Sequence, residues 1–263
     1  MAEVDVTEPT TEESNKVLTE AGYQEDAPPS YSTPQKAVAE FVGTFTLIFI
    51  GVGSIVAATA AKGGAGGAGL VTIAIAHGLA IAVMVTAVGH ISGGHLNPAV
   101  TVAAMAARKI HPRDALVYLG AQLAGAVAGA AVLRGALPES LWRSAKLGTP
   151  GLGGGVSAAQ GVVIEAVLTF FLVWVVFATA VDPRGAFGKI AGLAIGFVVL
   201  MDIMAGGPFT GGAMNPARFF GPALVGGYWA DLWVYVVGPI AGGLAAAAVY
   251  GVVMLPRHET ETA

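Results

Sequence analysis

Two short stretches, one in each half of the chain, combine a glycine-rich loop, an Asn-Pro-Ala tripeptide and an apolar run. The tripeptides are Asn97, Pro98, Ala99 and Asn215, Pro216, Ala217. Asparagine is a favoured helix N-cap, and proline fits the first helical position because the N–H it lacks would have no partner there. Each tripeptide therefore predicts a helix start that presents free N–H donors and a positive dipole end. Inside a membrane, that chemistry would hydrogen-bond small polar molecules and repel cations.

The composition of the chain indicates a membrane protein. Of its 263 residues, 55% are hydrophobic and 11% are charged, and the mean hydropathy is +0.71. A soluble domain carries roughly 25% charged residues, so this chain is too apolar for that class. No basic patch suggests binding to nucleic acid, and the absence of cysteine excludes a disulfide.

The first 34 residues form a polar, acidic segment in front of the apolar part. Residues 1–36 hold 8 acidic side chains and two lysines, together with several prolines. Such a composition cannot build a core, so we expect a disordered acidic tail at 1–34. The segment lacks the basic start and apolar run of a cleavable signal peptide. A short tail is also expected at 257–263, which leaves 35–256 as the membrane domain.

Six apolar spans follow, each near the ~20 residues that cross a bilayer. We place them at about 37–61, 70–90, 112–134, 160–181, 189–206 and 230–254. Two shorter apolar segments, 97–107 and 215–226, are too short to cross and predict half-helices. Eight lysines and arginines fall on the side of the termini and four on the other side, with Arg218 set aside. That bias predicts a multi-pass protein of the cell membrane with both termini in the cytoplasm.

The two halves of the apolar region repeat each other, with repeat 1 at about 37–134 and repeat 2 at about 160–254. The segment that starts at Glu40 matches the one that starts at Glu165, and the two tripeptides are 118 residues apart. Three spans per repeat is an odd number, so the second repeat must enter the membrane upside down. The half-helices then dip in from opposite faces and meet at their N-termini, with the two asparagines side by side near the midplane.

These features resemble the aquaporins, also called major intrinsic proteins. The resemblance covers residues 37–255 and depends on the twin tripeptides, on Glu40 and Glu165 in the first span of each repeat, and on Arg218, three residues after Asn215. The segments that most resemble plant tonoplast intrinsic proteins are Ala180–Pro183, Leu193–Phe197 and Ala205–Arg218.

The resemblance implies an all-α membrane protein with six transmembrane helices and two half-helices in an inverted 3+3 repeat. It also implies a homotetramer in which every subunit has its own pore. Asn97 and Asn215 would each point an amide N–H at the pore axis, so that a water there cannot pass a proton along the file. Glu40 and Glu165, ionisable groups inside spans, would brace the irregular loops behind the pore.

The resemblance also implies a narrow filter on the outer side of the pore. The residues that match the filter positions are His77, Ile203, Gly212 and Arg218. This set resembles one class of tonoplast intrinsic proteins. It departs from strict water channels, which pair an aromatic residue with histidine, and from glycerol facilitators, which use two aromatic residues. Ile203 and Gly212 therefore predict an opening that is wider and less polar on one side.

Other positions give a mixed indication of the substrate. Phe219 matches neither class, since glycerol facilitators carry aspartate at this position and water channels usually carry a small residue. Ala223 and Tyr235 are water-like choices, whereas Val236 is a glycerol-type choice. The loop between Arg134 and Gln160 has no counterpart of the histidine seen in ammonia-conducting relatives. Asp202 stands where the plant relatives carry asparagine, and we interpret it as a hydrogen-bonded helix-packing residue, with a pore-facing group as the alternative.

We therefore predict a passive channel for water and small neutral solutes that excludes ions and protons. The alternative is a glycerol, urea or ammonia facilitator with water as a secondary substrate. A coupled transporter is disfavoured because the predicted midplane holds asparagine and proline rather than paired ionisable groups. A junction protein without conduction is disfavoured by the two intact tripeptides. No metal cluster or nucleophile–base set stands out, so we expect no enzymatic activity, no metal and no cofactor.

Overall fold

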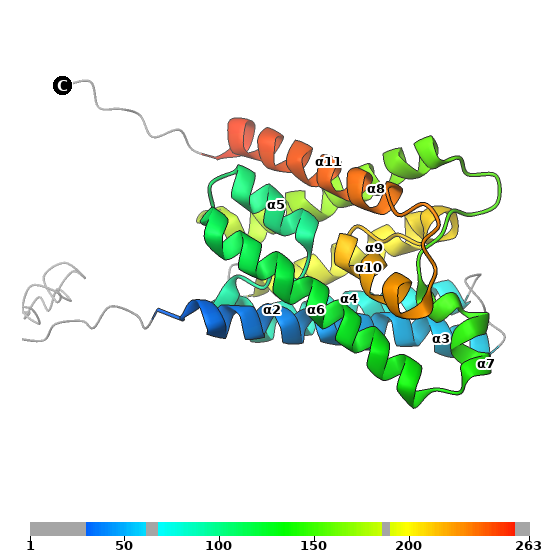
Figure 1. The fold of residues 1–263 in the computed structure, drawn as a ribbon. Helices are drawn as coiled ribbons and strands as arrows, with labels where there is room; N and C mark the ends of the chain where they lie inside the picture. The colour runs from blue at the N-terminus through cyan, green and yellow to red at the C-terminus, as the bar shows by residue number, and fades with distance from the viewer. Residues whose placement is uncertain (1–29, 62–67, 186–189, 256–263) are drawn as a thin grey trace, which may run out of the picture. The chain divides into compact units, whose positions relative to one another are not determined.

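The computed structural model describes residues 30–61, 68–185 and 190–255, and this part of the chain is built from helices joined by turns and loops (Figure 1). The chain divides into two units, Met1–Tyr31 and Ser32–Ala263, and the fold below is that of the second. The elements are α2 (Thr33–Leu47), η1 (Ile48–Val52), α3 (Gly53–Ala60), α4 (Ala68–Ser92), α5 (Pro98–Ala106), α6 (Pro112–Ala136), α7 (Glu139–Ser144), η2 (Lys146–Gly148), α8 (Ala158–Val176), η3 (Phe177–Val181), α9 (Ala191–Thr210), α10 (Pro216–Gly226), α11 (Val234–Val249) and η5 (Tyr250–Met254).

Six helices of the described part are long and apolar enough to cross a membrane. They span Thr33–Ala60, Gly69–Ser92, Pro112–Ala136, Ala158–Val181, Ala191–Thr210 and Val234–Met254. The predicted six-span architecture is therefore confirmed. The first span begins at Thr33, so the last residues of the predicted tail are helical, with Ser32 as N-cap and Pro34 in the first turn. Residues 1–29 and 257–263 of the predicted tails lie outside the described residues.

The two predicted half-helices, α5 and α10, each begin at the proline of their tripeptide, with asparagine as the N-cap. Their lengths of 9 and 11 residues correspond to about 14–17 Å at 1.5 Å per residue, roughly half of a bilayer core. Pro98 and Pro216 suit these starts because no N–H is needed at that position.

The packing of the helices follows the predicted inverted repeat. Within the repeats, α2 packs on α6 and α8 on α11, while α4 and α9 pack on each other across the repeat boundary. Each half-helix also packs on the opposite repeat, α5 on α11 and α10 on α6. Glycines allow the close approach, since a Cβ at Gly125 would collide with the Phe41 carbonyl and one at Gly242 with the Ala166 carbonyl.

Candidate functional site

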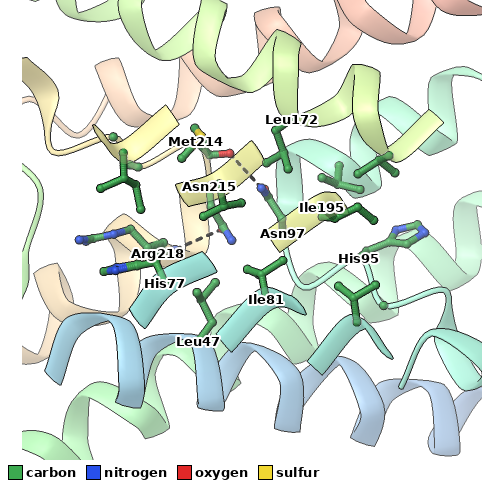
Figure 2. Close-up of a pocket in the computed structure, with 18 of the residues that line it drawn as sticks. Leu47, His77, Ile81, His95, Asn97, Leu172, Ile195, Met214, Asn215 and Arg218 are labelled. Carbon is green, nitrogen blue, oxygen red and sulfur yellow. Dashed lines mark hydrogen bonds between the residues drawn. The ribbon is translucent and has the colours of Figure 1, made fainter. Parts of the chain in front are cut away.

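A narrow cavity lies where the two half-helices meet (Figure 2). Its volume is about 50 Å³. A single water needs roughly 10–15 Å³ of such space, so the cavity suits a short file of a few waters. Both tripeptide asparagines line it, and so do the four predicted filter residues, His77, Ile203, Gly212 and Arg218. The structure therefore brings together side chains that are up to 141 residues apart (77 to 218) in the sequence.

The amide of Asn97 is fixed by two hydrogen bonds. Its Oδ1 accepts from the Ala99 N–H at 2.8 Å, which caps α5. Its Nδ2 donates to the carbonyl of Met214, in the loop of the other repeat, at 2.9 Å (Figure 2). An amide nitrogen carries two hydrogens, so one N–H remains for the cavity.

The amide of Asn215 is held in the same way from the other side. Its Oδ1 accepts from the N–H groups of Ala217 at 2.9 Å and Arg218 at 3.2 Å, and its Nδ2 donates to the Leu96 carbonyl at 2.9 Å. The two asparagines thus cross-link the two pore loops. The sequence predicted that they face each other but did not predict the carbonyl that each of them binds.

Left-handed backbone in the two pore loops turns those carbonyls toward the asparagines. Positive φ angles recur at matching positions: Gly93 (87°), Gly94 (61°), Leu96 (51°) and Gly211 (83°), Gly212 (54°), Met214 (52°). Glycine adopts this region freely, whereas leucine and methionine do so at a cost. Such strain persists where surrounding contacts over-determine the backbone, and here the buried glutamates supply those contacts.

The carboxylate of Glu40 accepts four hydrogen bonds and is fully buried. Oε1 accepts from Ser92 Oγ at 2.7 Å and the His95 N–H at 2.9 Å. Oε2 accepts from the Leu96 N–H at 2.7 Å and Gln122 Nε2 at 2.7 Å. These donors would otherwise be unsatisfied beside the pore, so the carboxylate stabilises the irregular backbone of the first loop.

Glu165 holds the second loop with the same geometry. Oε1 accepts from Thr210 Oγ1 at 2.6 Å and the Ala213 N–H at 2.9 Å, and Oε2 accepts from the Met214 N–H at 2.7 Å. Ser92 and Thr210 are both five residues before the tripeptide asparagine. A comparison of the two repeats would have found this pair of hydroxyl partners.

The repeats differ behind the two loops. In repeat 1, Gln122 Nε2 also donates to Thr101 Oγ1 at 2.9 Å, and Thr101 lies 3.1 Å from His95 Nδ1. At the corresponding place in repeat 2, Phe219 stacks on Tyr235 with ring centroids 4.7 Å apart. The position of Thr101 in repeat 1 is therefore polar and hydrogen-bonded, whereas the matching position of Phe219 in repeat 2 is aromatic and stacked.

The predicted filter residues surround one end of the cavity. His77 Nδ1 bonds to the Ile73 carbonyl at 2.9 Å, so in the neutral ring Nδ1 carries the proton and Nε2 is an acceptor. A Cβ at Gly212 would lie 3.3 Å from the Cα of Ile203, so these two residues are in close contact. Arg218 is 3% exposed, and its Nη1 donates to the Gly148 carbonyl at 2.9 Å. No sequence pattern indicated Gly148.

Asp202 is buried beside the filter and does not belong to the cavity lining among the described residues. This placement agrees with the interpretation of a helix-packing residue. Its Oδ2, however, has no hydrogen-bond partner in the described part of the chain. The prediction of a hydrogen-bonded carboxyl is therefore wrong for that oxygen.

The side of the bundle where α2 begins and η5 ends, at the left of Figure 1, carries an ion pair of its own. Arg184 Nη2 lies 2.7 Å from Asp182 Oδ2, and Tyr250 Oη donates to the same oxygen at 3.2 Å. The hydrogen bond from the Arg184 side chain, aided by its backbone N–H, holds the pKa of Asp182 well below its usual value.

In the described part of the chain, no group of three or more His, Cys, Asp or Glu could hold a metal ion.

Comparison with known proteins agrees with this geometry. The sequence model of the family described as "Major intrinsic protein" matches residues 29–250. "Aquaporin TIP4-4" of Zea mays is 47% identical over 236 residues, which cover 85% of this chain and 91% of the relative. "Probable aquaporin TIP3-2" of Arabidopsis thaliana is 45% identical over 234 residues, with 83% of each chain covered. The solved structure of the aquaglyceroporin from Plasmodium falciparum superposes with a TM-score of 0.74 at 26% identity, covering 84% of this chain and 97% of that one.

Proposed function

This chain belongs to the major intrinsic protein family and is a multi-pass membrane channel for water, and we propose that its filter also admits small neutral solutes while ions and protons are excluded. Members of that family are channels rather than enzymes. The single observation that carries the proposal is the convergence of Asn97, Asn215 and the four predicted filter residues on one cavity.

We propose that the two asparagines interrupt proton transfer. Asn97 and Asn215 each have an oxygen and one N–H engaged with protein, which leaves one N–H for the water file. A water that accepts from both points its hydrogens away from the centre, so no continuous donor chain runs through it. The N-termini of α5 and α10 add two positive dipole ends at the same place, which disfavours cations.

The filter offers a neutral solute one donor group, one acceptor and one apolar wall. Arg218 supplies N–H donors and positive charge, and we propose that the Nε2 of neutral His77, which is buried and has no protein partner in the described residues, is the acceptor. Ile203 and Gly212 line the remaining side without polar side chains. A molecule with both a hydrogen-bond acceptor and a donor, such as urea or glycerol, can therefore exchange some of its hydration for these groups.

The assembly and the membrane are proposals that rest on the family. We propose a homotetramer with one pore in each subunit, because apolar side chains such as Leu79, Val83 and Phe197 are exposed on the spans and face lipid or another subunit. The termini are placed in the cytoplasm because the basic residues of the inner loops gather on their side. The similarity to TIP aquaporins favours a vacuolar membrane over the cell membrane predicted from the sequence.

Stopped-flow light scattering on proteoliposomes tests the function. We expect faster water flux than in empty vesicles, measurable urea or glycerol flux, and no added proton or potassium leak. Each solute is measured with the same vesicle preparation, so that the ratio of permeabilities is independent of protein density. A protein that passes water alone would contradict solute passage, and one that passes a solute faster than water would favour the facilitator alternative.

A further inference from the structure

The loop between α6 and α8, here called the strap (residues 137–156), joins the two repeats and contacts the filter from outside. We propose that the strap sets the width of the filter by fixing the position of Arg218, and that Trp142 is the residue that anchors the strap. The inference rests on the proposed filter and extends it to a segment that does not line the cavity among the described residues. Trp142 and Gly148 are thus positioning residues for solute selection.

Arg218 depends on the strap for its orientation. Among the described residues, the guanidinium makes its one hydrogen bond to protein through Nη1, to the Gly148 carbonyl at 2.9 Å, and its buried Nε has no partner. When the head group of a long side chain is held by one hydrogen bond, the position of the bonding partner determines the position of the head group. The position of a single carbonyl oxygen therefore decides how far the charge reaches into the cavity.

The backbone around that carbonyl is held in an unusual conformation. Lys146, Leu147 and Gly148 have φ angles of 48°, 47° and 63°, three successive residues in the left-handed region. Two of them are not glycine, so the turn persists only where packing over-determines it. Leu147 is fully buried, and a Cβ on Gly148 would lie 2.8 Å from Val52 Cγ1. The turn is therefore wedged against η1.

Trp142 supplies the packing that holds this turn in place. Its side chain is 4% exposed and belongs to the same buried cluster as Leu147 and Val52. The guanidinium groups of Arg134 and Arg143 lie over its ring, 5.0 and 4.8 Å from the ring centroid. Such contacts keep a tryptophan in one orientation.

The strap also contacts α10, the half-helix that carries Arg218, near the C-terminal end of that helix. A Cβ on Gly226, at the end of α10, would lie 3.3 Å from the Cβ of Leu147 in the strap. Arg134 of α6, beside the Trp142 ring, donates from Nη1 to the carbonyl of the neighbouring Val225 at 2.6 Å. Further along the strap, the Gly153 N–H donates to the Phe209 carbonyl at 2.7 Å, next to the second pore loop. The strap thus contacts the first turn of α10 through Gly148, its last turn through Leu147, and the end of α9 through Gly153, so a displaced strap displaces the filter.

Replacing Trp142 by alanine tests the proposal in the full-length channel. We expect the ratio of urea to water permeability to rise about fivefold or more. Lowering the barrier to urea permeation by the free energy of one hydrogen bond changes the rate on the order of tenfold. Trp142→Phe, which keeps an aromatic ring in contact with both guanidinium groups, should stay near wild type. Trp233→Ala, which removes an exposed tryptophan from the start of α11, is the matched control and should leave the ratio unchanged.

A double-mutant cycle separates positioning from a general loss of stability. If the strap acts through Arg218, Trp142→Ala should change the ratio in the wild type and not in the Arg218→Ala background. Additive effects would overturn the proposal, and so would an unchanged ratio in Trp142→Ala. If Trp142→Ala does not assemble, Arg134→Gln replaces it in the same cycle, because it removes the guanidinium that bonds to Val225 and lies over the Trp142 ring. An Arg218→Ala variant with wild-type selectivity would instead refute the proposed filter.

Discussion

Replacing each buried glutamate by glutamine tests whether the carboxylates hold the pore loops through their hydrogen bonds. Glutamine keeps the shape of glutamate but offers one acceptor oxygen in place of two. At Glu165, Oε1 accepts from Thr210 and Ala213 whereas Oε2 accepts from Met214 alone. A glutamine whose oxygen takes the Oε1 position therefore loses one hydrogen bond.

At Glu40 the same substitution loses two hydrogen bonds in either orientation. Oε1 accepts from Ser92 and His95, and Oε2 accepts from Leu96 and Gln122. A buried donor without a partner costs about 1–3 kcal/mol. The loss of stability is then about 1–3 kcal/mol for Glu165→Gln and about 2–6 kcal/mol for Glu40→Gln, by the same count.

Thermal unfolding of the purified protein in detergent, followed by near-ultraviolet circular dichroism, measures the difference. We expect Glu40→Gln to lower the midpoint about twice as far as Glu165→Gln, in proportion to the bonds lost. Glu139→Gln is the control, because Glu139 is exposed and pairs with Arg143 at the surface, where an ion pair contributes little. Equal losses at the two glutamates, or a larger loss at Glu165, would refute the assignment of stability to these hydrogen bonds.

Three further predictions concern the pore and the side of the bundle where the chain begins. Asn97→Ala or Asn215→Ala should raise proton or potassium leak in vesicles, since each removes a central donor and a helix cap. Unchanged leak and folding in both variants would contradict the proposed role of the asparagines in excluding cations and protons. Ile203→His should lower urea or glycerol flux about tenfold, because a narrower opening leaves a polar group of the solute unpaired, and it should change water flux only a few-fold. A parallel fall of the water and solute fluxes would contradict this prediction. Asp182→Asn should lower the unfolding midpoint by a constant amount between pH 5 and 8, because a carboxyl with a lowered pKa stabilises the fold above its unfolded pKa of about 3.9. The difference should shrink as the pH falls below about 4, because the unfolded wild-type chain then binds a proton at Asp182 that the folded protein does not; a difference that grows in acid would show the wrong sign.

Much of the fold could be predicted because the two repeats carry the same sequence pattern. The spans follow from apolar length, and the half-helices follow from an asparagine cap before proline. The matching of the Glu40 and Glu165 segments gave the inverted repeat, and with it the meeting of the two asparagines. The hydrogen bonds of these asparagines to Leu96 and Met214 could not be predicted, because they depend on left-handed backbone at residues that are not glycine.

The strap escaped prediction for a different reason. It occurs once, between the repeats, so no second copy marks which of its residues carry a function. Gly148 acts through its carbonyl, which every residue type possesses, and the sequence letter therefore carries no signal. The sequence did not indicate that Trp142 contacts Arg134 and Arg143, whose guanidinium groups both lie over its ring in the structure.

The proposed filter differs between the two repeats. Arg218 lies 118 residues after Val100, the separation of the two tripeptides, and both residues line the cavity. One half-helix thus brings a cation to the pore, and the other brings an isopropyl group. The strap contacts Arg218 through Gly148, so the proposed positioning segment and the charge lie at the same end of the cavity.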